Sequence, residues 1–146
     1  MVIMIKYLIN NLPLFSHLWN DLHIEVTPVP VSLLNKDGRA ESSASIRERV
    51  LAARAIQTER FKNNIGVHCN AQMGSKLTRE YCRLTDECRS IMEMAMNRLG
   101  LSARAYDRII RVSRTIADLE ASPDINPDHL REAITYRSLD RDSWGR

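Results

Sequence analysis

The stretch LSARAYDR at residues 101–108 opens the segment that decides the fold of this chain. Gly100 is suited to end one helix and Ser102 to cap the next, which predicts a helix from Ala103 to about Ala121. Apolar residues cover one side of this helix: Ala105, Tyr106, Ile109, Ile110, Val112, Ile116 and Ala117. An apolar face of this width predicts that the helix packs into a core.

Three arginines lie on the other side of the same helix. Arg104, Arg108 and Arg111 are spaced at i, i+4 and i+7, so they share one face. Guanidinium groups on a rigid helix are suited to phosphate recognition, and Arg104 stands in the first turn. The same spacing is also that of a solvated helix face without a ligand, so the pattern alone leaves both interpretations open.

A last helix is predicted after the central one. Pro123 blocks continuation of the central helix, Asn126 is a suitable cap, and Pro127 suits the first helical position. His129 falls near the third position, where neighbouring groups can hold it structurally. The inner face consists of Leu130, Ala133, Ile134 and Tyr136. The polar tail at 138–146 is expected to fray.

Three helices are predicted before the central one. They cover about 45–62, 76–82 and 85–99. Ser45 and Glu48 form a capping box that opens the first helix, and Thr85 caps the third. The core-facing stripe of the first helix consists of Ile46, Val50, Ala53, Gln57 and Phe61. The pattern predicts a mainly α fold, a small antiparallel bundle of four to five helices over residues 45–141.

An N-terminal arm with one strand is expected to precede the bundle. In DLHIEVTPVP at 21–30, three apolar residues alternate with polar ones, which is typical of a half-buried strand. They are Leu22, Ile24 and Val26. The predicted organisation is an arm with this strand and a linker over 1–44, a helical domain over 45–141 and a tail over 142–146.

Size and composition fit one compact domain. The chain has 146 residues, of which 44% are hydrophobic and 27% charged, as in ordinary soluble globular proteins. A net charge of +3 is compatible with nucleotide or nucleic-acid binding but indicates neither.

Three cysteines without CxxC spacing argue against a disulfide framework and favour a reducing cytoplasm. Lys6 and Asn10 interrupt the apolar start, so no membrane span of about 20 residues is expected.

Motifs for autonomous nucleotide hydrolysis are absent from the sequence. Neither GxxxxGK[ST] nor GxGxxG occurs, and no apolar strand ends in paired carboxylates that would hold Mg²⁺. A zinc site built from His68, Cys69, Cys82 and Cys88 is disfavoured by their irregular spacing. Buried or half-buried inert cysteines are expected instead.

Five segments of the chain form an ordered set of motifs. They are SSASIRERVLAARAIQTERF at 42–61, NAQM at 70–73, REYC at 79–82, LSARAYDRIIRVSRTIADLEAS at 101–122 and HLREAITYRSLDR at 129–141. Together they resemble the C-terminal domain of magnesium-chelatase-like AAA+ ATPases, in particular the competence-associated ComM (YifB) branch. DLHIEVTPVP resembles the family segment just before that domain. The resemblance covers about residues 21–141.

The resemblance implies the function of a lid. Full-length members carry a Lon-protease-like N-terminal domain, an AAA+ nucleotide-binding core and this helical lid, and they assemble as rings. ComM-type members act on DNA as ATP-driven branch-migration motors during natural transformation. In AAA+ lids an arginine at the start of the penultimate long helix reaches the γ-phosphate, and Arg104 matches this sensor-two position. Arg108 and Arg111 are candidate phosphate contacts, and no catalytic or metal-binding residue is expected.

The chain also departs from the family. The Lon-like domain, the phosphate loop, the magnesium-binding strand and sensor one are missing, and Trp19 stands where the family would place an arginine that reaches a neighbouring subunit's nucleotide. The chain is therefore expected to be a non-catalytic, cytoplasmic lid fragment. ATP and Mg²⁺ are expected only with a complete AAA+ core, and the expected partners are that core or full-length ATPase subunits.

Two alternatives to the lid stay open at the level of sequence. The first is a small basic helical module that binds DNA or RNA through Arg47, Arg54 and the arginines of the central helix. The second is a regulatory module that docks on an ATPase ring and competes with its own lid. Salt-dependent duplex binding favours the first, and co-purification with such an ATPase favours the second.

Overall fold

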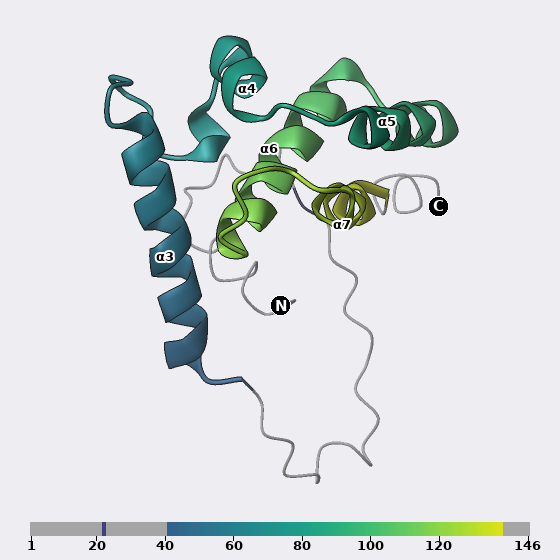
Figure 1. Cartoon of the computed structure of the whole chain (residues 1–146). Coiled ribbons are helices and arrows are strands. Elements are labelled where there is room, and N and C mark those ends of the chain that lie inside the picture. Colours follow the sequence, from purple (N-terminus) through teal and green to yellow (C-terminus); the bar gives the residue numbers. More distant parts are fainter. Residues whose placement is uncertain (1–21, 23–40, 139–146) are drawn as a thin grey trace, which may run out of the picture.

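The computed structural model describes residue 22 and residues 41–138, and Figure 1 shows that this part of the chain is helical. Its elements are α3 (Ser43–Phe61), the 3₁₀ helix η2 (Asn70–Gln72), α4 (Ser75–Tyr81), α5 (Asp86–Leu99), α6 (Ala103–Leu119) and α7 (Pro127–Ser138). The predicted mainly α fold is confirmed. The strand predicted within 21–30 lies, apart from Leu22, outside the described residues.

Helix α6 lies in the middle of the domain, between α3 and α7 (Figure 1). It packs against α3, α4, α7 and η2, whereas α5 packs against α7. Its buried residues include the predicted apolar ones Ala105, Ile109, Ile110, Ile116 and Ala117, and also Arg108, Ser113, Arg114 and Asp118. The predicted apolar face is therefore confirmed, and polar side chains extend the buried surface around the helix.

The first helix begins earlier than predicted. Ser42 is the N-cap of α3, and its hydroxyl accepts a hydrogen bond of 3.2 Å from the main-chain N–H of Ser45. The predicted capping box of Ser45 and Glu48 is therefore wrong, because Ser45 lies in the first turn and its hydroxyl donates to Glu41. The predicted stripe is buried at Ala53, Gln57 and Phe61 and half-buried at Ile46 and Val50.

The boundaries of the later helices follow their predicted caps. The hydroxyl of Thr85 accepts from the N–H of Cys88, and that of Ser102 accepts from the N–H of Ala105. Gly100 ends α5 with φ of 59°, the left-handed conformation that glycine adopts without steric cost. These three predicted caps are confirmed. They could be predicted because each depends only on neighbouring residues.

Helix α6 ends at Leu119, before the predicted Ala121. Ala121 has φ of 52°, and its N–H binds the carbonyl of Asp118 at 3.1 Å. The N–H of Ser122 binds the carbonyl of Ala117 at 2.8 Å. This pair of reversed hydrogen bonds is a Schellman motif, which ends the helix before Pro123 can do so.

The hydrophobic core is built around α6 and is mostly aliphatic. It consists of Phe61, Met73, Cys82, Cys88, Met92, Ile109, Ile110, Ile116, Ile125, Leu130 and Ala133. The predicted burial of the cysteines is confirmed, since Cys82 and Cys88 are buried and Cys69 is half-buried, and all three are free thiols. Between Glu41 and Ser138, no helix combines the length and apolar character that crossing a membrane requires.

Candidate phosphate-sensing helix and its supporting polar cluster

The first turn of α6 carries the candidate sensor. Ser102 caps the helix with a hydrogen bond of 3.3 Å from the N–H of Ala105. Arg104 lies two residues after the cap and is exposed. It also takes part in a polar or electrostatic contact within the chain. The N-terminal end of a helix carries partial positive charge, so this turn and the guanidinium favour an anion from the same side.

The other two arginines of the predicted face are more covered than Arg104. Arg108 is 9% exposed and, like Arg104, makes a polar or electrostatic contact. Arg111 is half-buried, and its Nη1 donates to the main-chain carbonyls of Ala71 at 3.0 Å and Met73 at 3.4 Å. The structure therefore brings the three arginines to one helix but leaves Arg104 the most accessible of them. The roles of Arg108 and Arg111 as phosphate contacts stay predictions.

The segment between α3 and α4 approaches Arg111. It contains η2, and Met73 directly after it is buried in the core. Met73 anchors the loop from the apolar side, and Arg111 holds it through two carbonyl oxygens. The NAQM motif at 70–73 is thus part of the packing around α6.

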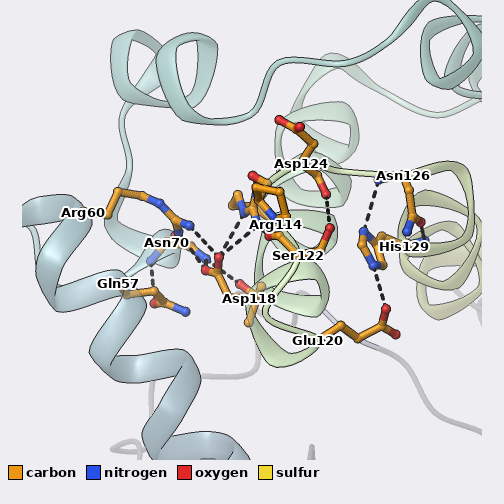
Figure 2. A network of polar contacts seen from close by, with 12 residues as sticks. Gln57, Arg60, Asn70, Arg114, Asp118, Glu120, Ser122, Asp124, Asn126 and His129 are labelled. Carbon is orange, nitrogen blue, oxygen red and sulfur yellow. Dashed lines mark hydrogen bonds and ion pairs between the residues drawn. The ribbon is translucent and has the colours of Figure 1, made fainter.

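A buried polar cluster joins the C-terminal half of α6 to α3 and η2 (Figure 2). Its centre is the Asp118 carboxylate, whose side chain is fully buried. Arg60 donates through Nη1 to Oδ2 at 2.7 Å and through Nη2 to Oδ1. Asn70 donates through Nδ2 to Oδ2 at 2.7 Å, and Arg114 donates through Nε to Oδ1 at 3.1 Å. The carboxylate thus accepts four hydrogen bonds from three segments of the chain.

The members of this cluster also bind main-chain and neighbouring groups. Arg114 donates to the carbonyls of Ser122 at 2.6 Å and Pro123 at 2.7 Å, which fixes the turn that leads toward α7. The Asn70 side chain accepts from Arg60 at 2.8 Å, and its main-chain N–H donates to Gln57 at 3.1 Å. Asn70 is therefore held on several sides and is only 1% exposed.

Electrostatic balance makes Asp118 essential to the cluster. Two guanidinium groups, with side chains 12% exposed in Arg60 and 3% in Arg114, share this one buried carboxylate. A buried charge without its partner is costly, so loss of Asp118 would leave the buried Arg114 and the half-buried Arg60 without their shared counter-charge. Burial raises the pKa of the nearby Cys82 thiol to about 11, an increase that Arg114 and Arg60 only partly offset.

Sequence reasoning missed this cluster. Its signal was a charged pair, Arg114 and Asp118, at i and i+4 next to the apolar positions Ile110 and Ala117 on the helix surface. Charged residues at the edge of an apolar face require partners from other segments. Their distant partners, Arg60 and Asn70, carry no local pattern that identifies them.

The start of α7 confirms the structural interpretation of His129. Asn126 Oδ1 accepts from the N–H groups of Asp128 and His129, both at 3.0 Å. His129 Nδ1 accepts from the N–H of Asn126 at 3.1 Å, so the ring hydrogen lies on Nε2, which contacts Glu120 at 2.9 Å. His129 thus closes the cap and joins it to the end of α6 (Figure 2).

Comparison with known proteins places this domain. The family described as magnesium chelatase, subunit ChlI C-terminal, matches residues 40–137. Over 122 residues, or 83% of the chain, the sequence is 47% identical to competence protein ComM of Haemophilus influenzae. Over the same share it is 40% identical to YifB of Escherichia coli and 37% identical to YifB of Salmonella typhimurium. The matched region makes up 23% of each of these relatives. The chain therefore belongs to the family of magnesium chelatase ChlI-type C-terminal domains and is similar to the C-terminal part of ComM and YifB.

Proposed function

We propose that this chain is the C-terminal lid of a ComM-type AAA+ ATPase and that Arg104 senses the phosphates of ATP bound by a separate core. The observation that carries the proposal is the position of Arg104, exposed in the capped first turn of the most buried helix. A guanidinium at a helix start can make charge-assisted hydrogen bonds to phosphate oxygens. The rest of α6 is held by packing and by the Asp118 cluster, so its first turn has a defined position.

The chain on its own is proposed to be non-catalytic. Its sequence contains no phosphate loop, and the arginine of a lid can only add charge to a triphosphate that another domain holds. ATP and Mg²⁺ therefore belong to a complex of this chain with an AAA+ core or with full-length ATPase subunits in a ring. The similarity to a competence protein supports a role in DNA processing, namely branch migration during natural transformation.

The test is a chimera of Haemophilus influenzae ComM in which the matched C-terminal residues are replaced by those of this chain. We expect the Arg104→Ala chimera to hydrolyse ATP at least about tenfold more slowly, since a positioned cation on a transferring phosphoryl group is lost. Arg98→Ala is the matched control, because Arg98 is exposed in the last turn of the neighbouring helix α5. Equal hydrolysis by the Arg104→Ala and parent chimeras would refute the proposed role of Arg104.

A second candidate function is binding of DNA by α3. Arg47 and Arg54 are both exposed and lie two turns apart on this helix. If they contact phosphates, duplex binding by the isolated chain weakens with salt, and Arg47→Ala reduces the slope of log K against log salt by about one. Binding that is insensitive to both changes would exclude this surface.

A further inference from the structure

We propose that Arg60 and Asp118 act as a positioning pair that fixes the angle between α3 and α6. The pair joins the last turn of α3 to the last turn of α6, and its contacts involve both oxygens of the carboxylate and two nitrogens of the guanidinium. The consequence for Arg104, which α6 carries, rests on the lid function proposed above.

The geometry of the pair fixes a direction as well as a distance. A bidentate contact between a guanidinium and a carboxylate keeps the two planes aligned, whereas a single hydrogen bond would allow rotation. Asn70 contacts both partners, donating to Asp118 at 2.7 Å and accepting from Arg60 at 2.8 Å. Arg114 holds the other carboxylate oxygen. The carboxylate is therefore prevented from turning (Figure 2).

The distribution of burial along α3 makes this pair decisive. The buried residues of α3 are Ala53, Gln57 and Phe61, all in its C-terminal half. No residue in the range 43–52 is buried, and Leu51 is 55% exposed. In Figure 1 this half of α3 stands clear of the other labelled helices. Within the described part of the chain, the buried contacts of the helix thus lie at its C-terminal end, where the pair lies.

A small rotation of α3 at its attached end produces a large displacement of its far end. A helix of 19 residues is about 28 Å long at 1.5 Å per residue. A rotation of roughly 10° at its attached end moves the far end by roughly 5 Å over that length. The pair therefore relates the direction of α3 to that of α6, which carries Arg104. Arg60 and Asp118 are positioning residues in this proposal, because they act on the direction of α3 and do not touch the phosphate.

The experiment measures the angle directly, by pulsed electron spin resonance on the full chain. Nitroxide labels are attached to Arg47→Cys on α3 and Ala103→Cys at the start of α6, both exposed positions, in a Cys69→Ser background. We expect one narrow distance peak in this labelled parent. Asp118→Asn and the milder Arg60→Lys should broaden or shift the peak, because each removes the bidentate contact.

The matched control is Glu41→Gln, which removes an ion pair with Arg49 at the other end of α3, where both side chains are about 40% exposed. It should leave the peak narrow. A narrow, unshifted peak in folded Arg60→Lys would overturn the proposal, since the pair would then only stabilise the fold. A peak broadened to the same extent by Glu41→Gln would also overturn it. If Asp118→Asn does not fold, Arg60→Lys decides.

The ATPase chimera separates this proposal from the lid function. If the lid function and the positioning pair are both correct, Arg60→Lys reduces ATP hydrolysis, while circular dichroism shows an unchanged helix content. If Arg104→Ala has no effect while Arg60→Lys still broadens the distances, the lid function fails and the positioning pair stands. If Arg104→Ala slows hydrolysis and the Arg60→Lys distances stay narrow, the positioning pair alone fails.

Discussion

At the scale of single residues, the most consequential group is the buried carboxylate of Asp118. It is the shared acceptor of Arg60, Asn70 and Arg114, and its side chain is fully buried. Hydrogen bonds to charged groups contribute more than neutral ones, and their loss leaves an uncompensated charge in a low-dielectric interior. The stability of the domain is therefore unusually sensitive to this one side chain.

Replacing Asp118 by alanine is expected to lower the free energy of unfolding by about 3–5 kcal/mol, because the guanidinium groups of buried Arg114 and half-buried Arg60 lose their counter-charge. Urea unfolding followed by circular dichroism measures this loss. Glu59→Ala is the control, since Glu59 forms an exposed ion pair with Lys62 and its removal should change stability by less than about 0.5 kcal/mol. Similar losses for the two variants would contradict a central role for Asp118.

The Cys82 thiol makes stability depend on alkaline pH. Its pKa rises from 9.0 to about 11 on folding, chiefly through burial, so the folded chain holds this proton more tightly than the unfolded chain. The stabilising contribution is complete below pH 9 and is lost as the pH rises toward 11. Its slope is at most about 1.4 kcal/mol per pH unit.

Urea unfolding between pH 8 and pH 11 tests this dependence. Cys82→Ala should lose stability less steeply than the parent over this range. Cys69→Ala, at a half-buried position, should follow the parent curve. Superimposable pH profiles for Cys82→Ala and the parent would rule out the buried thiol as the cause.

At the scale of helices and turns, local hydrogen bonding determined what the sequence could predict. The caps at Thr85, Ser102 and Asn126 were predictable because a hydroxyl or amide reaches an N–H only two or three residues away. The start of α3 was misplaced because Ser42 and Ser45 offer the same chemistry. The 3₁₀ helix η2 was not predicted; its Asn70 side chain binds the distant Asp118, a contact that no local pattern indicates.

The end of α6 offers a test of backbone strain. Ala121 has φ of 52°, a conformation that costs an L-residue with a Cβ about 1–2 kcal/mol and costs glycine little. Ala121→Gly is expected to raise the free energy of unfolding by about 1 kcal/mol, measured by thermal or urea unfolding. Ala55→Gly, the same change at an exposed position inside α3, should lower it by about 1 kcal/mol. Stability changes of the same sign in both variants would contradict this interpretation.

At the scale of the whole molecule, the domain is organised around α6. Hydrophobic periodicity predicted the buried face of this helix and the helical bundle, because apolar burial drives both. It could not predict that Arg114 and Asp118 would be buried as well, since their partners lie on α3 and η2. The three arginines of the predicted face lie on one helix, but Arg108 is buried, and η2 approaches Arg111 and holds it.

Hydrogen exchange should follow this organisation. Amides of α6, which is covered by four other elements, are expected to exchange most slowly, near the rate set by global unfolding. Amides in the range 43–52, where no side chain is buried, should exchange fastest among the helical ones. Exchange measured by mass spectrometry at neutral pH distinguishes them, and uniform protection of α3 along its length would contradict the one-sided attachment of this helix.

The turn between α3 and η2 has a practical consequence. Ile65 is completely exposed there, and beyond Gly66 and its two chain neighbours no heavy atom lies within 4 Å of where a Cβ on Gly66 would stand. Exposed loop tips of this kind accept inserted peptides with little disturbance of the fold. An epitope placed between these two residues would give a purification and imaging handle that leaves both chain ends and the first turn of α6 untouched.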